Sequence, residues 1–182
     1  MNLLDLDARW RRLNDPDYSC PCCGQSFGGL VDMGFEEPDA WPFGERGDAE
    51  VFEAGDDKLS ADLCRVGERR FLRAILPLPV RGAEDAALFA LWAEVAPEDF
   101  YATLDAIDAG TEPPACPATL ANELPEFGLP DGTLVPGTEA ERPTFRAGSG
   151  PLAEVQEAGL SFDALLDLYA ALGQDIRPHL QG

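Results

Sequence analysis

The segment Cys20–Gly24, which reads Cys-Pro-Cys-Cys-Gly, constrains the fold of this chain more than any other. A Cys-x-x-Cys-Gly turn brings two thiolates together within one tight turn, and nearby backbone N–H groups stabilise their charge. Such a turn is half of a four-ligand metal site. No second Cys-x-x-Cys pair follows, because the remaining cysteines, Cys64 and Cys116, each stand alone. The sequence therefore predicts an N-terminal metal knuckle without the second pair that would complete it.

A structural zinc ion is one interpretation of this knuckle. Cys20 and Cys23 supply two ligands, and Cys64, at the start of a predicted hairpin, is the natural third. The candidates for the fourth ligand are Cys116, Cys22, Asp62 and His179. The alternative interpretation is a tight thiol-bearing loop that packs on the sheet without metal. The residue pattern leaves both open, because a tetrahedral site needs four ligands and the pattern supports three.

Catalytic chemistry has little support in the sequence. A redox dithiol of Cys20 and Cys23 needs a helix N-terminus to lower a thiol pKa, and the residues after Gly24 predict a loop instead. His179 is the only histidine and stands three residues from the C-terminus, where a solvated tail is expected. A multi-histidine metal centre is therefore excluded, and no phosphate-binding loop or nucleophile elbow occurs. We predict no catalytic and no cofactor-binding residues, and an enzyme is disfavoured.

The length of 182 residues and a hydrophobic content of 45% predict one domain with a sizeable core. Within it we distinguish an N-terminal helix and turn at residues 1–17, the knuckle with an ordered loop at 18–50, and a sheet with helices at 51–182. Trp41 and Trp92 are expected in the core. The expected fold class is α+β, a single domain with an antiparallel sheet and helices packed on one face.

The periodicity of apolar residues predicts the individual elements. Apolar residues at helical spacing indicate a helix over residues 3–13, and Gly67-Glu68 between two apolar runs indicates a hairpin. Ser161 is the expected N-cap of the last helix. Expected strands cover residues 62–66, 69–79, 86–96, 119–124 and 144–147, and expected helices cover 97–109, 151–157 and 162–172.

Arg73 is the most unusual charged residue of the predicted hairpin. It lies between Phe71 and Ile75 on one face of its strand, and both faces of that strand are largely apolar. A guanidinium in such a place needs a partner, and Asp62 across the hairpin is the expected one. We therefore predict a partly buried Asp62–Arg73 ion pair that fixes the register, in preference to an anion-binding site.

The charge balance bounds the classes of partner. The chain has 34 Asp and Glu residues against 13 Lys and Arg residues, for a formal net charge of -21. Such a surface repels phosphate backbones and anionic lipids, so neither nucleic acid nor membrane is an expected ligand. A basic protein is the class of partner that it could attract, and the alternative interpretation is that the acidic surface only maintains solubility. No apolar run approaches the roughly 18 residues of a membrane span, and no secretory signal precedes the knuckle. We expect a cytoplasmic protein whose five cysteines are reduced, buried or metal-bound.

Six short motifs are distributed along most of the chain. They read Tyr18-x-Cys20-x-x-Cys23-Gly24, Asp32-Met33-Gly34-Phe35-x-x-Pro38-x-x-Trp41, Leu59-Ser60-x-Asp62-x-Cys64, Phe71-Leu72-Arg73-Ala74-x-Leu76-x-Leu78-Pro79-Val80, Leu91-Trp92 and Pro151-Leu152-Ala153-x-x-Gln156-x-x-Gly159. In combination they resemble the uncharacterised bacterial family called domain of unknown function number 2199. The resemblance implies no known activity. In that family a histidine usually precedes the Pro-Leu-Ala turn, where this chain has Gly150. If that histidine completes a metal site in relatives, the site here has lost a ligand or found another.

These observations favour a cytoplasmic, non-enzymatic module that binds another protein and carries a cysteine knuckle, for which a structural zinc ion is one of the two interpretations. One alternative is a thiol- or metal-dependent enzyme that uses Cys20, Cys23 and Cys64. A second alternative is an acidic, immunity-like inhibitor that blocks a basic toxin by charge complementarity. The sequence does not choose among these three, and it leaves the oligomeric state open.

Overall fold

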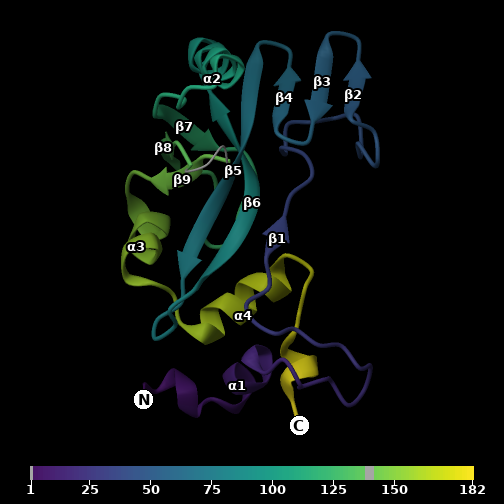
Figure 1. The fold of residues 1–182 in the computed structure, drawn as a ribbon, viewed down its shortest axis with the longest axis vertical. Helices are drawn as coiled ribbons and strands as arrows, with labels where there is room; N and C mark the ends of the chain where they lie inside the picture. Colours follow the sequence, from purple (N-terminus) through teal and green to yellow (C-terminus); the bar gives the residue numbers. More distant parts are fainter. Residues whose placement is uncertain (1, 138–141) are drawn as a thin grey trace. The chain divides into compact units, whose positions relative to one another are not determined.

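The computed structural model describes residues 2–137 and 142–182 (Figure 1). The chain divides into two compact units, each assembled from separate stretches of sequence. Unit 1 comprises Met1–Asp32, Leu78–Leu88 and Glu154–Gly182, and unit 2 comprises Met33–Pro77 and Phe89–Ala153. Unit 1 therefore brings both ends of the chain together. In the part of the chain that is described, every helix is too short or too polar to cross a bilayer.

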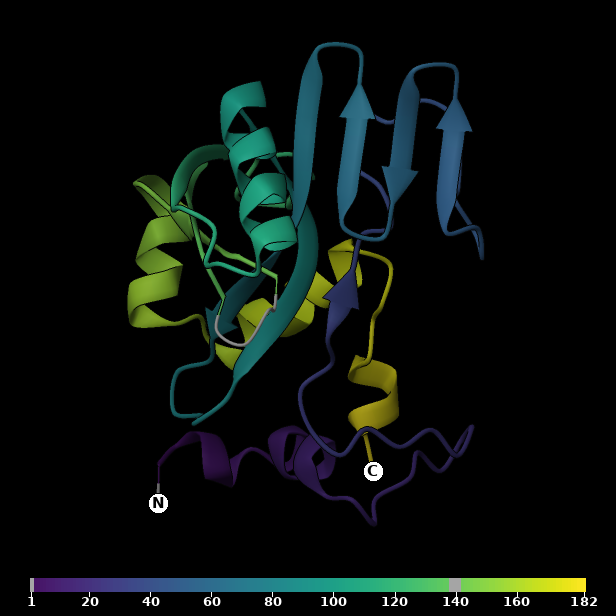
Figure 2. The same ribbon diagram turned by 45° about the horizontal axis from the view of Figure 1, so that its top comes forward.

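The strands join in one sheet that closes on itself. Their bounds are β1 Met33–Gly34, β2 Val51–Ala54, β3 Asp57–Ser60, β4 Leu63–Val66, β5 Arg69–Pro79, β6 Ala86–Val95, β7 Cys116–Leu120, β8 Asp131–Val135 and β9 Thr144–Ala147. Their order is β1-β6-β7-β8-β9-β5-β4-β3-β2, and β5 also pairs with β6. This extra pairing closes β5 to β9 into a five-stranded barrel. Strands β4, β3 and β2 extend the sheet from β5 with alternating direction (Figure 2).

Turn chemistry explains the two hairpins that lead into the barrel. In the β4–β5 hairpin Val66 faces Arg69, so Gly67 and Glu68 form a two-residue turn, as the sequence predicts. The β2–β3 hairpin has the same form around Gly55. Gly67 and Gly55 have φ angles of 56° and 65°, and a positive φ is what such a short turn requires and glycine supplies.

Barrel closure depends on pairings that a simple antiparallel sheet does not contain. Strand β9 runs parallel to β5, with Ile75 opposite Thr144. Strands β8 and β9 approach each other so closely that a Cβ atom on Gly132 would collide with the carbonyl oxygen of Arg146. Only glycine fits at this contact. The predicted α+β class is confirmed, and the mostly antiparallel sheet curls into a barrel.

Capping residues mark the N-terminus of α4 and the C-terminus of α2. Their bounds are η1 Leu4–Leu6, α1 Ala8–Asn14, α2 Pro97–Ala109, α3 Gly150–Ala158, α4 Phe162–Ala171 and η2 Arg177–Leu180. The side chain of Ser161 accepts a hydrogen bond from the Ala164 N–H, which confirms it as the N-cap of α4. Gly110 ends α2 in the left-handed conformation. Helix α2 lies against β5, since Tyr101 contacts the guanidinium of Arg70.

Several predicted elements differ from the observed ones. The predicted strand at residues 119–124 is β7, which begins and ends earlier, at Cys116 and Leu120. Sequence reasoning missed β8 and the β2–β3 hairpin. Residues 131–135 and 51–60 are rich in Asp, Glu, Gly and other polar residues, so their alternation of buried and exposed positions is weak at the sequence level.

Unit 2 contains a hydrophobic cluster to which the barrel strands β5 and β6 contribute. Its buried members are Trp41, Leu59, Cys64, Phe71, Trp92 and Ala121. The predicted burial of Trp41 and Trp92 is confirmed, and each indole N–H donates to a backbone carbonyl, that of Gly44 and that of Phe35 respectively. Asn122, almost fully buried, accepts from the Trp92 backbone N–H at 2.8 Å. The loop over residues 35–48 is therefore ordered by packing and hydrogen bonds instead of regular structure.

Candidate metal centre

The cysteine knuckle lies in unit 1 and is a tight turn closed by backbone hydrogen bonds. The Cys20 N–H donates to the carbonyl of Gln25, and the Gly24 N–H donates to the carbonyl of Cys20, both at 2.8 Å. Gly24 has a φ of 75°, which reverses the chain after Cys23. These contacts place three sulfur atoms on one small turn, those of Cys20, Cys22 and Cys23.

The C-terminal segment that carries His179 is anchored against the N-terminal part of unit 1. The hydroxyl of Tyr18 donates to the His179 carbonyl at 3.0 Å, and Arg12 donates to the carbonyl of Leu180 at 2.7 Å. Leu180 is fully buried, and the ring of Phe27 lies 6.4 Å from the imidazole. Figure 1 shows α1 beside this segment. The expectation of a solvated tail at His179 is therefore wrong, because an apolar anchor and two hydrogen bonds hold the segment in place.

Four potential ligand atoms converge at this point. The group consists of Cys20, Cys22, Cys23 and His179, and their ligand atoms all lie within 4.8 Å of one another. The Sγ atoms of Cys20 and Cys22 are 2.8 Å apart, and Cys23 Sγ lies 3.4 Å from His179 Nδ1. Cys20 is buried, while Cys22 and Cys23 are exposed. This arrangement is able to hold a metal ion.

The thiols of Cys20 and Cys22 shift each other's pKa in opposite directions. A hydrogen bond from Cys22 lowers the pKa of Cys20 to about 6, and His179 contributes in the same direction. The same hydrogen bond raises the pKa of Cys22 to about 11. The lowered pKa of Cys20 favours its thiolate, which is the form that ligates a metal.

The third predicted ligand, Cys64, has a different environment. It lies on β4 in the hydrophobic cluster of unit 2, only 1% exposed, and burial raises its pKa to about 12. Cys116 on β7 is also buried, and burial raises its pKa too. Neither belongs to the ligand group found among the described residues. Their neutral thiols act as small apolar side chains. The residues whose ligand atoms lie close to those of Cys20 and Cys23 are Cys22 and His179.

The predicted Asp62–Arg73 ion pair is replaced by two other pairs in unit 2. The guanidinium of Arg73 lies 3.6 Å from the carboxylate of Glu36, whereas Asp62 pairs with Arg142 at 2.6 Å. Arg73 and Asp62 are instead joined through the backbone, since the Arg73 N–H donates to the Asp62 carbonyl at 2.9 Å. The expected side-chain pair does not form because β4 begins at Leu63, so Asp62 lies in the bend before the strand.

Cys22 and His179 were both among the candidates for the fourth ligand, but no sequence pattern favoured either of them. Cys22 is inside the knuckle itself, and a Cys-x-Cys-Cys turn with three thiols is a signal that the Cys-x-x-Cys pattern hides. His179 carries the only imidazole in the chain, and its proximity to the knuckle depends on the packing of η2. Because 156 residues separate Cys23 from His179, no local sequence pattern predicts their contact.

Comparison with known proteins gives one match. The model of a bacterial family described as uncharacterised protein conserved in bacteria, DUF2199, matches residues 19–159. No curated protein and no solved structure matches the chain. The matched range contains the three cysteines of the ligand group and ends before His179. Because the match spans most of the 182 residues, with the knuckle inside it, the chain belongs to the bacterial family of domain of unknown function number 2199.

Proposed function

We propose that this protein is a non-enzymatic binding domain of the bacterial cytoplasm, stabilised by a structural zinc ion held by Cys20, Cys22, Cys23 and His179. The observation that carries the proposal is the convergence of these four ligand atoms within 4.8 Å of one another. Three thiolates and one imidazole are a common ligand set of structural zinc sites. Hard cations such as magnesium and calcium prefer oxygen ligands, so this set favours zinc.

The ligand count supports a structural role over a catalytic one. Catalytic zinc sites keep a coordination position open for water or substrate, with three protein ligands. Here four protein atoms are close enough to complete a tetrahedron, in which ligand atoms lie about 3 to 4 Å apart. The ion would cross-link the knuckle to a segment 156 residues further along the chain. Closing so long a loop restricts the unfolded chain strongly and stabilises the folded one.

Native mass spectrometry of untagged protein tests this proposal. Protein from zinc-supplemented medium is expected to carry one zinc ion per chain, and Cys23→Ser and His179→Gln are expected to lose it. Cys116→Ala is the matched control, because it removes a thiol outside the ligand group. Wild-type protein without metal, with Cys20, Cys22 and Cys23 all titrating freely, would contradict the proposal.

Binding of a basic protein is the second part of the proposal, and an acidic cavity in unit 2 supports it. The cavity has a volume of about 610 Å³ and lies beside Trp41. Its acidic lining residues are Glu36, Glu37, Asp39, Glu45 and Asp48. Burial, together with the charges of Glu45 and Glu36, raises the pKa of Glu37. A lysine or arginine side chain in this cavity would relieve that repulsion. At longer range, the net charge of -21 would attract a basic protein toward the chain.

A pull-down from the native host at several salt concentrations tests this second part. The wild-type chain is expected to retain a basic protein at low salt and release it as salt screens the exposed charges. The Glu37→Gln/Glu45→Gln double variant is expected to release it at lower salt than Asp105→Asn/Asp108→Asn, which makes the same charge change on exposed α2 positions. Equal retention of the basic protein by the two double variants would show that the cavity is not its binding site. If the retained protein is a toxin, the result supports the alternative of an immunity-like inhibitor.

The thiol-enzyme alternative has one observation in its favour, the 2.8 Å contact between the Cys20 and Cys22 sulfurs. A low-pKa thiol next to a second thiol is the arrangement that thiol–disulfide exchange uses. Turnover of a disulfide substrate by metal-free protein, abolished by Cys20→Ser, would replace the structural zinc proposal. If metal-free wild-type protein shows no such turnover, the structural zinc proposal is retained.

A further inference from the structure

A row of three positively charged residues crosses strands β3, β4 and β5 of unit 2. Lys58 lies directly opposite Arg65, and Arg65 lies directly opposite Arg70, so these residues form the cationic row. Residues that face each other in an antiparallel pair lie on the same face of the sheet, with Cβ atoms about 4.5 to 5.5 Å apart. Like charges in such positions are destabilising. The row also contrasts with the net charge of -21 for the whole chain.

The carboxylate that pairs with the cationic row lies at its outer end. Lys58 pairs with Glu53 of β2 at 3.2 Å. Asp57 precedes Lys58 in the same strand and therefore lies on the opposite face of the sheet. Among the described residues, neither Arg65 nor Arg70 forms an ion pair with a carboxylate. Two positive charges of the row are therefore not neutralised by direct contact in this part of the chain.

Arg70, at the inner end of the row, supports the hydroxyl group of Tyr101. Its side chain is only 6% exposed, and one terminal nitrogen donates to the carbonyls of Gly67 and Arg69. Its Nε and its other terminal nitrogen both donate to the Tyr101 hydroxyl oxygen at 3.4 Å. Tyr101 is on α2 and is 45% exposed. Because its oxygen accepts from Arg70, and no acceptor for its O–H lies among the described residues, this O–H is available to a ligand.

Arg65, in the middle of the row, is the least satisfied of the three cations. It is half-buried, and its Nε is buried without a hydrogen-bond partner among the described residues. An unpaired buried donor and an opposed like charge both cost stability. An anion bound beside Arg65 would offset the repulsion between Arg65 and its neighbours in the row.

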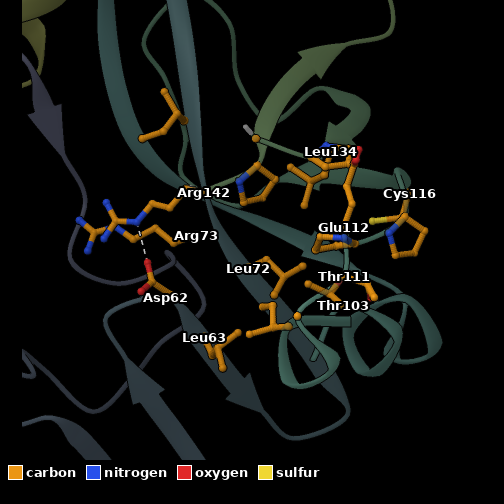
Figure 3. Close-up of a pocket in the computed structure, with 18 residues that line it drawn as sticks. Asp62, Leu63, Leu72, Arg73, Thr103, Thr111, Glu112, Cys116, Leu134 and Arg142 are labelled. Carbon is orange, nitrogen blue, oxygen red and sulfur yellow. Dashed lines mark hydrogen bonds and ion pairs between the residues drawn. The ribbon is translucent and has the colours of Figure 1, made fainter. Parts of the chain in front are cut away.

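The cationic row lies on the same face of the sheet as the apolar wall of a cavity. Leu63 and Leu72 face each other across β4 and β5, and with Thr103 of α2 they line a cavity of about 1060 Å³ (Figure 3). Arg65 and Arg70 are each two residues away from one of these leucines, and residues two apart in a strand share a face. The face therefore changes from apolar to cationic along the two strands, and α2 borders both parts.

We propose that Arg65 and Tyr101 bind the dianionic group of a phosphate monoester, with the charge of Arg70 behind them. The guanidinium of Arg65 offers a fork of N–H donors that matches phosphate oxygens, and Tyr101 offers its O–H. Two positive charges without a carboxylate match the two negative charges that a phosphate monoester carries above its second pKa of about 6. A nucleic-acid backbone would be repelled by the acidic surface, so an isolated phosphate group is the expected ligand.

Calorimetric titration of the full-length protein at pH 8 with phenyl phosphate and with phenyl sulfate tests the proposal. The two probes share a ring and a tetrahedral head group, and they differ by one negative charge. Phenyl phosphate is expected to bind at least about tenfold more tightly than phenyl sulfate. Equal binding of the two, or no binding of phenyl phosphate, would overturn the proposal.

A capped phosphoserine peptide distinguishes the two sources of such a group. Tighter binding of the peptide than of phenyl phosphate would identify the ligand as a phosphorylated side chain of a protein. Tighter binding of phenyl phosphate would identify it as a small phosphate ester. Both results support recognition of the phosphate group, whereas equal binding of the peptide and its unphosphorylated form would contradict it.

A pair of arginine variants locates the binding site. Arg65→Gln removes a charge from the cationic row, and Arg146→Gln removes the same charge from an exposed position of β9. The affinity for phenyl phosphate is expected to fall about tenfold or more in Arg65→Gln and to stay within about twofold of wild type in Arg146→Gln. Tyr101→Phe keeps the ring and loses the hydroxyl, so an intermediate affinity is expected for it. Equal effects of Arg65→Gln and Arg146→Gln, with circular dichroism unchanged, would contradict the proposal.

Discussion

Cys23 Sγ lies 3.4 Å from His179 Nδ1, although 156 residues separate the two along the chain. This contact joins the N-terminal knuckle to the C-terminal η2 segment inside unit 1. Tyr18 and Arg12, both near the knuckle in sequence, donate hydrogen bonds to the same segment. Protein contacts therefore hold the segment in place even without a metal ion. Because the fold does not depend on the ion alone, the contribution of the ion is measurable as a change in stability.

Removal of metal is expected to destabilise the wild-type chain and to leave a ligand variant unaffected. Treatment with EDTA should lower the Tm of wild-type protein by roughly 5 °C or more, because each kcal/mol is worth a few degrees in a chain of this size. His179→Ala should already have the lower Tm and should not respond to EDTA. Differential scanning calorimetry measures both. An equal EDTA response in the two proteins would show that His179 does not take part in metal binding.

Alkylation is expected to separate the five cysteines into two classes. The pKa of Cys64 of about 12 leaves roughly one thiolate in ten thousand at pH 8, and the side chain is buried, so iodoacetamide should not modify it in folded protein. Cys116 is expected to behave in the same way. After metal removal Cys23 should react readily, because it is exposed. Peptide mass mapping before and after denaturation checks this, and rapid modification of native Cys64 would contradict the observed packing of β4.

Loss of the Arg73 side chain is expected to cost much more stability than loss of its acidic partner. Arg73 is buried and its guanidinium lies 5.8 Å from the ring of Trp92, so Arg73→Ala should lower the free energy of unfolding by about 2 to 3 kcal/mol through lost packing. Glu36→Gln should cost below about 0.5 kcal/mol, because that carboxylate is largely exposed. Urea denaturation of both variants measures the difference, and similar losses would show that the ion pair outweighs the packing.

Stability is expected to depend on pH partly through Glu37. Its pKa is raised above the ordinary 4.5, mainly by burial, so the folded state binds this proton more tightly than the unfolded state. The resulting stabilisation is complete below the unfolded pKa and is lost as pH rises through the folded pKa. Glu37→Gln, which is always neutral, should therefore be more stable than wild type at pH 7 and should lose that advantage in acid. Urea titrations at pH 4 and pH 7 check this, with Asp105→Asn at an exposed position of α2 as the control.

The sequence determined the elements whose signals are local. Strand β5, helix α2, the N-cap at Ser161 and the hairpin turn at Gly67 follow from apolar periodicity, capping residues and glycine in short turns. Each of these depends on residues a few positions apart, so the local sequence is enough. The knuckle itself is of this kind, because three thiols within one turn need only the backbone geometry of Gly24.

Only the tertiary structure decided the closure of the barrel and the composition of the ligand group. The parallel pairing of β5 with β9 joins Ile75 to Thr144, and the approach of His179 to Cys23 spans most of the chain. Likewise, the packing of β4 against Trp92 and Phe71, and not any property of its neighbours in sequence, turned Cys64 into a core residue. Such choices depend on the balance of burial and hydrogen bonding summed over the whole fold, since no local pattern favours one distant partner over another.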